Sequence, residues 1–334
     1  MIKVAINGLG RIGRSVFRIL SQRDDVDVLI VNDLAEHEGL AYLLRYDTVM
    51  GAFPGEVSLE DGVLRAGRQT TRMTAVRDPA DLDWKTDEID FVIESTGIFR
   101  TRASLQMHLD AGAGRVILTV PAKDEIDATV VLGVNDDHLR ADHRIVSNAS
   151  CTTNCLAPVA KVLNDRFGIV RGVMTTVHAY TNDQRLADVP HKDLRRSRAA
   201  AENIIPTTTG AARAVGKVLP ELAGKLDGMA MRVPVPDGSV VDLVAVLEQE
   251  PSADDIRAVI REAAEGPMRG VLQYCTEPVV SSDIIGNPHS SIFDADSTQA
   301  GGAHMVRILS WYDNEWGYSN RVVDLLTKLA AFDT

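Results

Sequence analysis

The stretch Ile2–Leu20, IKVAINGLGRIGRSVFRIL, decides the fold of the first half of this chain. Its apolar beginning predicts a buried strand, and an amphipathic run after the glycines predicts a helix. In the Gly-x-Gly-x-x-Gly pattern between them, Gly8 permits a tight turn, Gly10 lets the backbone approach a pyrophosphate, and Gly13 lets helix pack on strand. The stretch therefore predicts the first unit of a dinucleotide-binding Rossmann fold.

A second apolar run, Val26–Val31, is followed by Asn32 and Asp33. Asp33 lies 20 residues beyond Gly13, where a Rossmann fold places the acid that holds the ribose hydroxyls. Its carboxylate would repel the 2′-phosphate of NADP, and no Arg follows directly to accept that phosphate. NAD is therefore the expected cofactor, with dual use of NAD and NADP left open.

Further apolar runs at Ile89–Glu94, Arg115–Val120 and Asp127–Val134 predict more strands of the same sheet, with a helix over Ala103–Ala111. Alternation of strands with helices predicts an α/β domain with a doubly wound parallel sheet. Ligands of such sheets bind at the carboxyl ends of the strands, so the loops that begin at Ser95 and Pro121 should line the cofactor cleft.

The polar stretch Ser147–Cys155, SNASCTTNC, lies near the middle of the chain and precedes a run with helical apolar spacing. We therefore expect Cys151 at a loop-to-helix junction, where amide N–H groups and the helix dipole stabilise a thiolate and can hold an oxyanion. His178 is a candidate base, because a Cys with a sequence-distant His is the minimal nucleophile-and-base arrangement. Cys155 is interpreted as a packed residue, with a redox role beside Cys151 as the alternative.

Alternating runs in the second half, among them Gly172–Val177, Met229–Pro234 and Val240–Glu248, predict a mainly antiparallel or mixed sheet. With a helix over Asp254–Ala264, they indicate an α+β catalytic domain. The polar segment between His178 and Ile205 is interpreted as a packed functional loop. Its basic cluster, Lys192–Arg198, is either a solvated charged face or a site for a small anionic substrate. The expected domains are residues 1–149, completed by a C-terminal helix over 315–334, and residues 150–314.

Composition limits the function classes. The 334 residues exceed one ordinary domain, and 45% hydrophobic with 25% charged residues is typical of a globular protein. A net charge of −12 argues against nucleic acid as the main partner. Three cysteines make no disulfide framework, no apolar run is long enough for a bilayer, and the N-terminus lacks signal-peptide architecture. We expect a cytoplasmic protein with neither a membrane partner nor a metal site.

Five stretches in the right order resemble phosphorylating glyceraldehyde-3-phosphate dehydrogenase, and the resemblance covers essentially the full length. A twelve-residue match around a cysteine is far more specific than a glycine pattern. The stretches are SNASCTTNCLAP (147–158), TVHAYTND (176–183), NIIPTTTGAA (203–212), GKLDGMAMRVP (224–234) and WYDNEWGY (311–318).

The resemblance implies oxidation of D-glyceraldehyde 3-phosphate to 1,3-bisphosphoglycerate with NAD and inorganic phosphate in glycolysis, through a Cys151 hemithioacetal and thioester. It also implies a homotetramer. Cys151 would be the nucleophile and His178 the residue that activates it. The implied NAD-binding residues are Gly8, Gly10, Arg11, Ile12, Gly13, Asp33, Arg77, Thr119 and Asn314. Thr181 and Arg232 would hold the phosphate of the substrate. The residues implied for the attacking phosphate are Ser150, Thr152, Arg195, Thr209 and Gly210.

Two other functions compete with this interpretation. Erythrose-4-phosphate dehydrogenase shares the fold and the SNASCTTNC stretch but releases an acid with water, and the segments Ala179–Thr181 and Thr207–Ala212 resemble the triose enzyme better. A non-catalytic RNA-binding protein that uses the nucleotide groove is disfavoured by the acidic net charge. This function would also leave Cys151 and His178 without a role.

Overall fold

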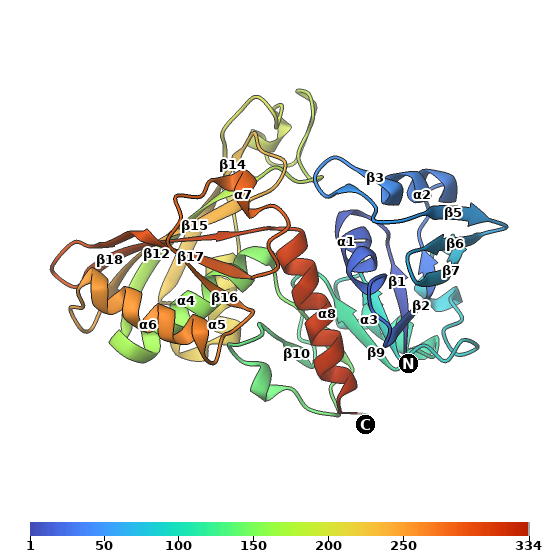
Figure 1. Ribbon diagram of the computed structural model, residues 1–334, viewed down its shortest axis with the longest axis horizontal. Helices are drawn as coiled ribbons and strands as arrows, with labels where there is room; N and C mark the ends of the chain where they lie inside the picture. The colour runs from blue at the N-terminus through green and yellow to red at the C-terminus, as the bar shows by residue number, and fades with distance from the viewer. Residues whose placement is uncertain (333–334) are drawn as a thin grey trace. The chain divides into compact units, whose positions relative to one another are not determined.

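The computed structural model describes residues 1–332 and contains two compact units (Figure 1). The first unit comprises residues 1–130, residues 138–149 and the C-terminal segment from Ser319. The second unit comprises residues 131–137 and 150–318.

A nine-stranded sheet forms the first unit, in the order β10-β11-β9-β8-β1-β2-β7-β6-β5. Every neighbouring pair from β10 to β7 is parallel, whereas β7-β6 and β6-β5 are antiparallel hairpins. The parallel strands are β1 (Ile2–Asn7), β2 (Val26–Asn32), β7 (Gln69–Thr74), β8 (Phe91–Glu94), β9 (Arg115–Leu118), β10 (Ala128–Thr129) and β11 (Ile145–Ser147), and the hairpins add β5 (Val57–Glu60) and β6 (Val63–Ala66). The predicted doubly wound parallel sheet is confirmed.

The glycine-rich turn lies between β1 and α1 (Arg11–Leu20). Gly8 has a φ of 96°, a left-handed conformation that favours glycine. A Cβ on Gly13 would lie 2.1 Å from the carbonyl oxygen of Gly8, so a side chain there would force helix and turn apart. The other helices of this unit are α2 (His37–Arg45) and α3 (Arg102–Asp110), and a small ribbon joins β3 (Tyr46–Asp47) to β4 (Gly51–Ala52).

The predicted strand over residues 127–134 is wrong beyond its first residues. Only the two-residue strand β10 forms, and a turn follows. Asn135 Oδ1 accepts the N–H of Val131 at 2.9 Å, and Asp136 Oδ1 accepts the N–H of Gly133 at 2.7 Å. These side chains take amide hydrogens that a strand would give to a neighbour, and Gly133 has a φ of 77°.

The second unit contains a seven-stranded sheet in the order β13-β14-β12-β15-β18-β17-β16. Its pairs are antiparallel except for β12 with β14 and β16 with β17, which confirms the predicted mixed sheet. The strands are β12 (Ile169–Ala179), β13 (Ile205–Thr208), β14 (Leu226–Val233), β15 (Ser239–Leu247), β16 (Leu272–Cys275), β17 (Ser291–Ala300) and β18 (Met305–Tyr312).

Helices α4 (Cys151–Phe167), α5 (Ala211–Val218) and α6 (Ala253–Glu265) cover one face of this sheet (Figure 1). The side chains of β15 alternate strictly between buried and partly exposed. One face of the sheet is therefore apolar and is covered by these helices. A short helix, α7 (Ser281–Ile284), lies in the connection between β16 and β17.

The last helix, α8 (Trp316–Ala330), begins within the second unit and continues into the first. Its side chains Val322, Leu325, Leu326 and Leu329 are fully buried, so the helix packs through an apolar face. None of the helices in residues 1–332 is long and apolar enough to cross a membrane.

Candidate active site

Cys151 is the first residue of α4, so the predicted loop-to-helix junction is confirmed. Ser150 is the N-cap, and its hydroxyl accepts the N–H of Thr153 at 3.1 Å. Ala149, just before it, has a φ of 54°, a conformation uncommon for a residue with a side chain. The capping serine thus ends the loop and sets where the helix begins.

The sulfur of Cys151 lies 3.7 Å from His178 Nε2. His178 is near the end of β12, and its register partner in the parallel strand β14 is Arg232. Arg232 Nη1 lies 2.6 Å from the other ring nitrogen, Nδ1, and 3.0 Å from the carbonyl oxygen of Ala179. The structure therefore brings together three residues that lie far apart in the sequence: Cys151, His178 and Arg232.

The protonation of the His178 ring depends on Arg232. Nδ1 lies 2.7 Å from the carbonyl oxygen of Ala179, to which it can donate, and it can instead accept from Arg232. It cannot do both at once. When Nδ1 donates to Ala179, Nε2 presents a lone pair to the thiol and can take its proton. An anion that attracts Arg232 favours this basic form.

Burial governs the charges of Cys151 and His178. Burial, together with the adjacent positive charge of Arg232, lowers the pKa of His178 to about 3, so the ring is neutral near pH 7. Burial raises the pKa of the Cys151 thiol, although Arg232 and the hydroxyl and amide of Thr152 act to lower it. The amide of Thr152, in the first turn of α4, thus acts in the direction that the sequence predicts, and burial acts against it.

Tyr312, at the end of β18, supports the same cluster, and sequence reasoning missed it. Its hydroxyl lies 2.8 Å from Thr152 Oγ1 and 2.9 Å from Thr176 Oγ1, and all three groups are buried. Its ring meets the His178 ring edge-on, with centroids 5.8 Å apart. The motif WYDNEWGY contains this tyrosine, but the motif alone does not show that it would contact His178.

The N-termini of α4 and α5 meet through Thr153. Its hydroxyl lies 2.7 Å from Ser150 Oγ and 3.5 Å from the carbonyl oxygen of Ala211, the first residue of α5. Gly210 is the N-cap of α5, and Thr209 Oγ1 accepts the N–H of Ala211 at 3.2 Å. Two helix N-termini with adjacent hydroxyls can hold an anion, because amide N–H groups and the positive ends of helix dipoles converge there.

Thr181 and Arg195 are held by other contacts. The Thr181 hydroxyl donates to Asp183, whose carboxylate also pairs with Arg196. Arg195 begins a 3-10 turn and its side chain is exposed. Within residues 1–332, no hydrogen bond links Thr181 or Arg195 to Cys151, His178 or Arg232.

The first unit contains a pocket of about 800 Å³ beside the glycine-rich turn. Asp33 lies in its wall, and its carboxylate accepts the N–H groups of Leu9 at 2.7 Å and Ala35 at 3.0 Å. Of the predicted cofactor residues, the lining includes Gly8, Gly10, Asp33 and Arg77. A glycine turn, a ribose-binding acid and a mostly apolar wall fit NAD.

The remaining predicted cofactor residues of the first unit are not among the residues that line this pocket. Arg11 forms an ion pair with Asp47, and Ile12 follows it in the first turn of α1. Gly13 packs against Gly8. Thr119 is buried, and its hydroxyl donates to the carbonyl oxygen of Glu94 at 3.1 Å.

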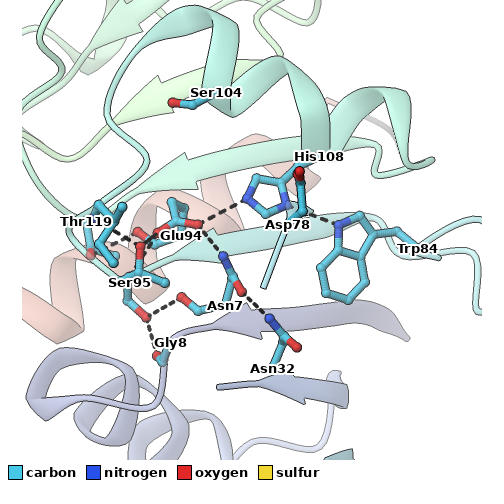
Figure 2. Close-up of polar contacts among 12 residues, drawn as sticks. Asn7, Gly8, Asn32, Asp78, Trp84, Glu94, Ser95, Ser104, His108 and Thr119 are labelled. Carbon is cyan, nitrogen blue, oxygen red and sulfur yellow. Dashed lines mark hydrogen bonds and ion pairs between the residues drawn. The ribbon is translucent and has the colours of Figure 1, made fainter. Parts of the chain in front are cut away.

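A buried polar network lies beside the pocket (Figure 2). The carboxylate of Glu94 receives hydrogen bonds from Asn7 Nδ2 at 2.6 Å and from the N–H and hydroxyl of Thr96 at 2.9 and 2.5 Å. His108 Nδ1 accepts from Trp84 Nε1 at 3.2 Å, so its Nε2 carries the proton that faces Glu94 at 3.1 Å. The network thus fixes Asn7 and Thr96, which line the pocket.

Asn314 belongs to the second unit and is also held in one orientation. Ser239 Oγ donates to Asn314 Oδ1 at 2.6 Å, which assigns the amide nitrogen as the end that can donate to another carbonyl. Ser239, like Tyr312, carried no signal in the sequence. Within residues 1–332, no group of three or more His, Cys, Asp or Glu side chains could hold a metal ion.

A dinucleotide-binding Rossmann unit, followed by a unit that presents a cysteine beside a histidine, fits the class of nicotinamide-dependent dehydrogenases. Family models narrow the class: residues 2–102 match the glyceraldehyde 3-phosphate dehydrogenase NAD-binding domain, and residues 150–314 match its C-terminal domain. The chain belongs to the glyceraldehyde 3-phosphate dehydrogenase family.

Curated proteins of this family match the sequence of this chain over nearly their whole lengths. Glyceraldehyde-3-phosphate dehydrogenase 1 of Bacillus subtilis is 57% identical over 330 residues, which cover 98% of each chain. The Priestia megaterium enzyme is 56% identical over 99% of this chain and 98% of its own, and the Mycolicibacterium smegmatis enzyme is 54% identical over 97% of each.

Proposed function

We propose that this protein oxidises D-glyceraldehyde 3-phosphate to 1,3-bisphosphoglycerate with NAD and inorganic phosphate, as a step of glycolysis. Family membership supports glyceraldehyde-3-phosphate dehydrogenase activity and NAD as the cofactor. The observation that carries the chemistry is the 3.7 Å contact between Cys151 Sγ and His178 Nε2. A thiol this close to a neutral imidazole can lose its proton as it attacks a carbonyl carbon.

The proposed reaction has three steps. Cys151 Sγ bonds to the aldehyde carbon while His178 Nε2 takes the thiol proton and passes it to the former carbonyl oxygen, so a hemithioacetal results and His178 is neutral again. Bound NAD supplies the hydride acceptor for the oxidation that follows. His178 takes the hydroxyl proton as the hydride leaves, so a thioester forms on Cys151. An oxygen of inorganic phosphate then attacks the thioester carbonyl, and the sulfur of Cys151 leaves.

We infer two anion sites for these steps. Arg232 and Thr181 hold the phosphate of the substrate, and recruitment of Arg232 by that phosphate releases His178 Nδ1 to donate to Ala179. The paired N-termini of α4 and α5 support the second site. The residues proposed for the attacking phosphate are Ser150, Thr152, Arg195, Thr209 and Gly210.

We propose that NAD occupies the pocket beside the glycine-rich turn. Asp33 binds the adenosine ribose there, and Asn314 donates its amide to the nicotinamide carboxamide. The other proposed cofactor residues are Gly8, Gly10, Arg11, Ile12, Gly13, Arg77 and Thr119. The proposed domains are residues 1–149 with 315–334 for the cofactor and residues 150–314 for catalysis.

We also propose a homotetramer that works in the cytoplasm. Several large apolar side chains of the second unit are exposed in the single chain and are available to such an assembly. Leu186 is 86% exposed, Leu194 81%, Ile204 69% and Val173 62%.

The test is formation of NADH from glyceraldehyde 3-phosphate and NAD, with and without inorganic phosphate, beside assays with NADP and with erythrose 4-phosphate. We expect strong turnover that requires phosphate and prefers NAD. Turnover that is indifferent to phosphate and faster with erythrose 4-phosphate would assign the protein to the hydrolytic relative. Equal rates with NADP would mean that Asp33 does not decide the cofactor.

A further inference from the structure

Two buried carboxyl groups lie beside Asn314, and the mechanism above uses neither. Asp237 lies between β14 and β15, Asp313 directly follows β18, and each is only 1% exposed. Asp237 Oδ1 accepts the backbone N–H of Asn314, the residue after Asp313, and the negative charge of Asp313 raises the pKa of Asp237. Two carboxylates buried this near each other repel strongly, so the arrangement favours one shared proton.

The surrounding donors show which carboxyl group carries that proton. Asp313 accepts backbone N–H groups on both oxygens: Gly286 at 2.7 Å on Oδ2, and Glu315 at 2.8 Å and Trp316 at 2.5 Å on Oδ1. Three such donors stabilise a carboxylate.

Asp237 is different, because only one of its oxygens meets N–H donors. Oδ1 accepts the N–H of Gly238 at 2.8 Å and that of Asn314 at 3.2 Å. Oδ2 is buried and receives no hydrogen bond from any donor in the described chain. An ionised oxygen would be costly there, whereas a hydroxyl that donates to Asp313 satisfies both groups.

We propose that Asp237 is a positioning residue that acts as a protonated acid: its Oδ2 holds a proton shared with Asp313, and the pair fixes the backbone that carries Asn314. Burial, with the negative charges of Asp313 and Glu315 facing it, raises the pKa of Asp237 to about 9. The pair therefore carries one negative charge near pH 7 and two at alkaline pH.

The pair connects to both parts of the reaction centre. Asp237 accepts the backbone N–H of Asn314, whose side chain is held by Ser239 Oγ, and Ser239 Oγ accepts the N–H of Ala179 at 3.1 Å, next to His178. A negative charge on Asp237 also raises the pKa of Cys151. While Asp237 holds the shared proton, it carries no negative charge that would raise the pKa of the Cys151 thiol further. This consequence for catalysis rests on the proposed function.

Matched isosteric variants test which acid carries the proton. In Asp237→Asn, the new amide can replace the hydroxyl and donate to Asp313, so the carboxamide rescues the contact. In Asp313→Asn, the new NH₂ faces backbone N–H groups and must leave at least one buried donor unsatisfied. We expect D237N to keep kcat within about threefold of wild type near pH 7, and D313N to lose about tenfold or more in kcat or in NAD affinity. The control is Asp296→Asn, which removes an exposed carboxylate from the same unit.

The pH profile separates this role from a merely structural one. Wild type should lose activity as pH rises through about 9, and D237N, which has no proton to lose there, should lack that alkaline limb. An unchanged alkaline limb in D237N, or a loss in D237N as large as in D313N, would overturn the proposal.

Infrared difference spectroscopy supplies a readout that needs no activity. At pH 7.5, where exposed carboxyl groups are ionised, wild type should show a protonated carboxylic acid band that D237N lacks and D296N keeps. Absence of the band in wild type would overturn the inference even if the enzyme is active. Presence of the band in a protein without dehydrogenase activity would overturn the proposed function and leave the shared proton standing.

Discussion

Arg232 is the residue whose charge reaches both reacting groups. It lowers the pKa of His178 and acts against the burial that raises the pKa of Cys151. Its guanidinium also competes with the carbonyl of Ala179 for His178 Nδ1. Removing it should therefore make His178 easier to protonate and Cys151 harder to ionise.

Arg232→Leu should slow alkylation of Cys151 by iodoacetamide at neutral pH and move the inflection of rate against pH upward by about one unit. Peptide mass spectrometry assigns the modified cysteine, and the burial of Cys155 and Cys275 keeps their background low. Arg213→Leu, which removes an exposed arginine on α5, is the control and should match wild type. Faster alkylation in R232L would contradict the assignment.

Tyr312→Phe removes the hydroxyl that joins Thr152 to Thr176 but keeps the ring beside His178. Two buried threonine hydroxyls then lose a partner, so the free energy of unfolding should fall by about 1–3 kcal/mol. Urea denaturation measures the change, and Tyr42→Phe, at an exposed tyrosine, provides the control. A change below about 0.5 kcal/mol would mean that the bridge adds little to stability.

At the scale of elements, the β1-to-α1 connection separates two uses of glycine. Gly13→Ala places a Cβ where the Gly8 carbonyl oxygen now lies, so we expect a lower Tm together with weaker NAD binding. Gly10→Ala meets nothing within 4 Å in the protein, so its Tm should stay near that of wild type. Its NAD affinity should still fall, because a Cβ there obstructs approach of the pyrophosphate.

Calorimetry gives the Tm of both variants, and fluorescence titration gives their NAD affinities. Normal NAD affinity in G10A would show that the pyrophosphate does not pass close to this residue. A normal Tm in G13A would show that the helix shifts at little cost.

Local patterns predicted those elements whose burial is continuous. The apolar runs that became β8 and β9 are buried throughout, and those that became β1 and β2 are buried over their last residues, so each run is recognisable by itself. The β5-β6-β7 hairpins were missed because β5 and β6 have only four residues each and Met73 is the one large apolar residue of β7, although Asp61-Gly62 is a turn signal.

The candidate site divides in the same way. Cys151 and His178 stand in polar surroundings that single them out in the sequence. Tyr312 contacts Thr152 and Thr176, which lie 160 and 136 residues earlier in the chain. Asp237 and Asp313 also come from separate segments, and only the packing of the strands brings them together. No periodicity of one segment contains that information.

At the scale of the whole molecule, stability at low pH should depend on His178. Its folded pKa of about 3 lies below the unfolded value near 6.5, so the unfolded chain binds the proton first as pH falls. The stability that neutral His178 provides is complete above about pH 6.5 and is lost between there and about pH 3, at up to about 1.4 kcal/mol per pH unit.

Urea denaturation over this pH range measures the slope, and His178→Asn should reduce it. His191→Asn, at a partly exposed histidine, supplies the comparison. Equal slopes in wild type and H178N would show that His178 is protonated in the folded protein and that its burial has been overstated.

The pairing of β12 with β14 has a consequence for how this family varies. His178 and Arg232 are direct neighbours in a parallel ladder, so their side chains emerge on the same face at a fixed spacing. A one-residue insertion inside either strand would turn one of them to the opposite face and separate the base from its arginine. An insertion in the long connection between the strands would move neither. The two strands should therefore be inherited as one unbroken block, and length variation between them should avoid the proposed phosphate-binding residues Thr181, Arg195, Thr209 and Gly210.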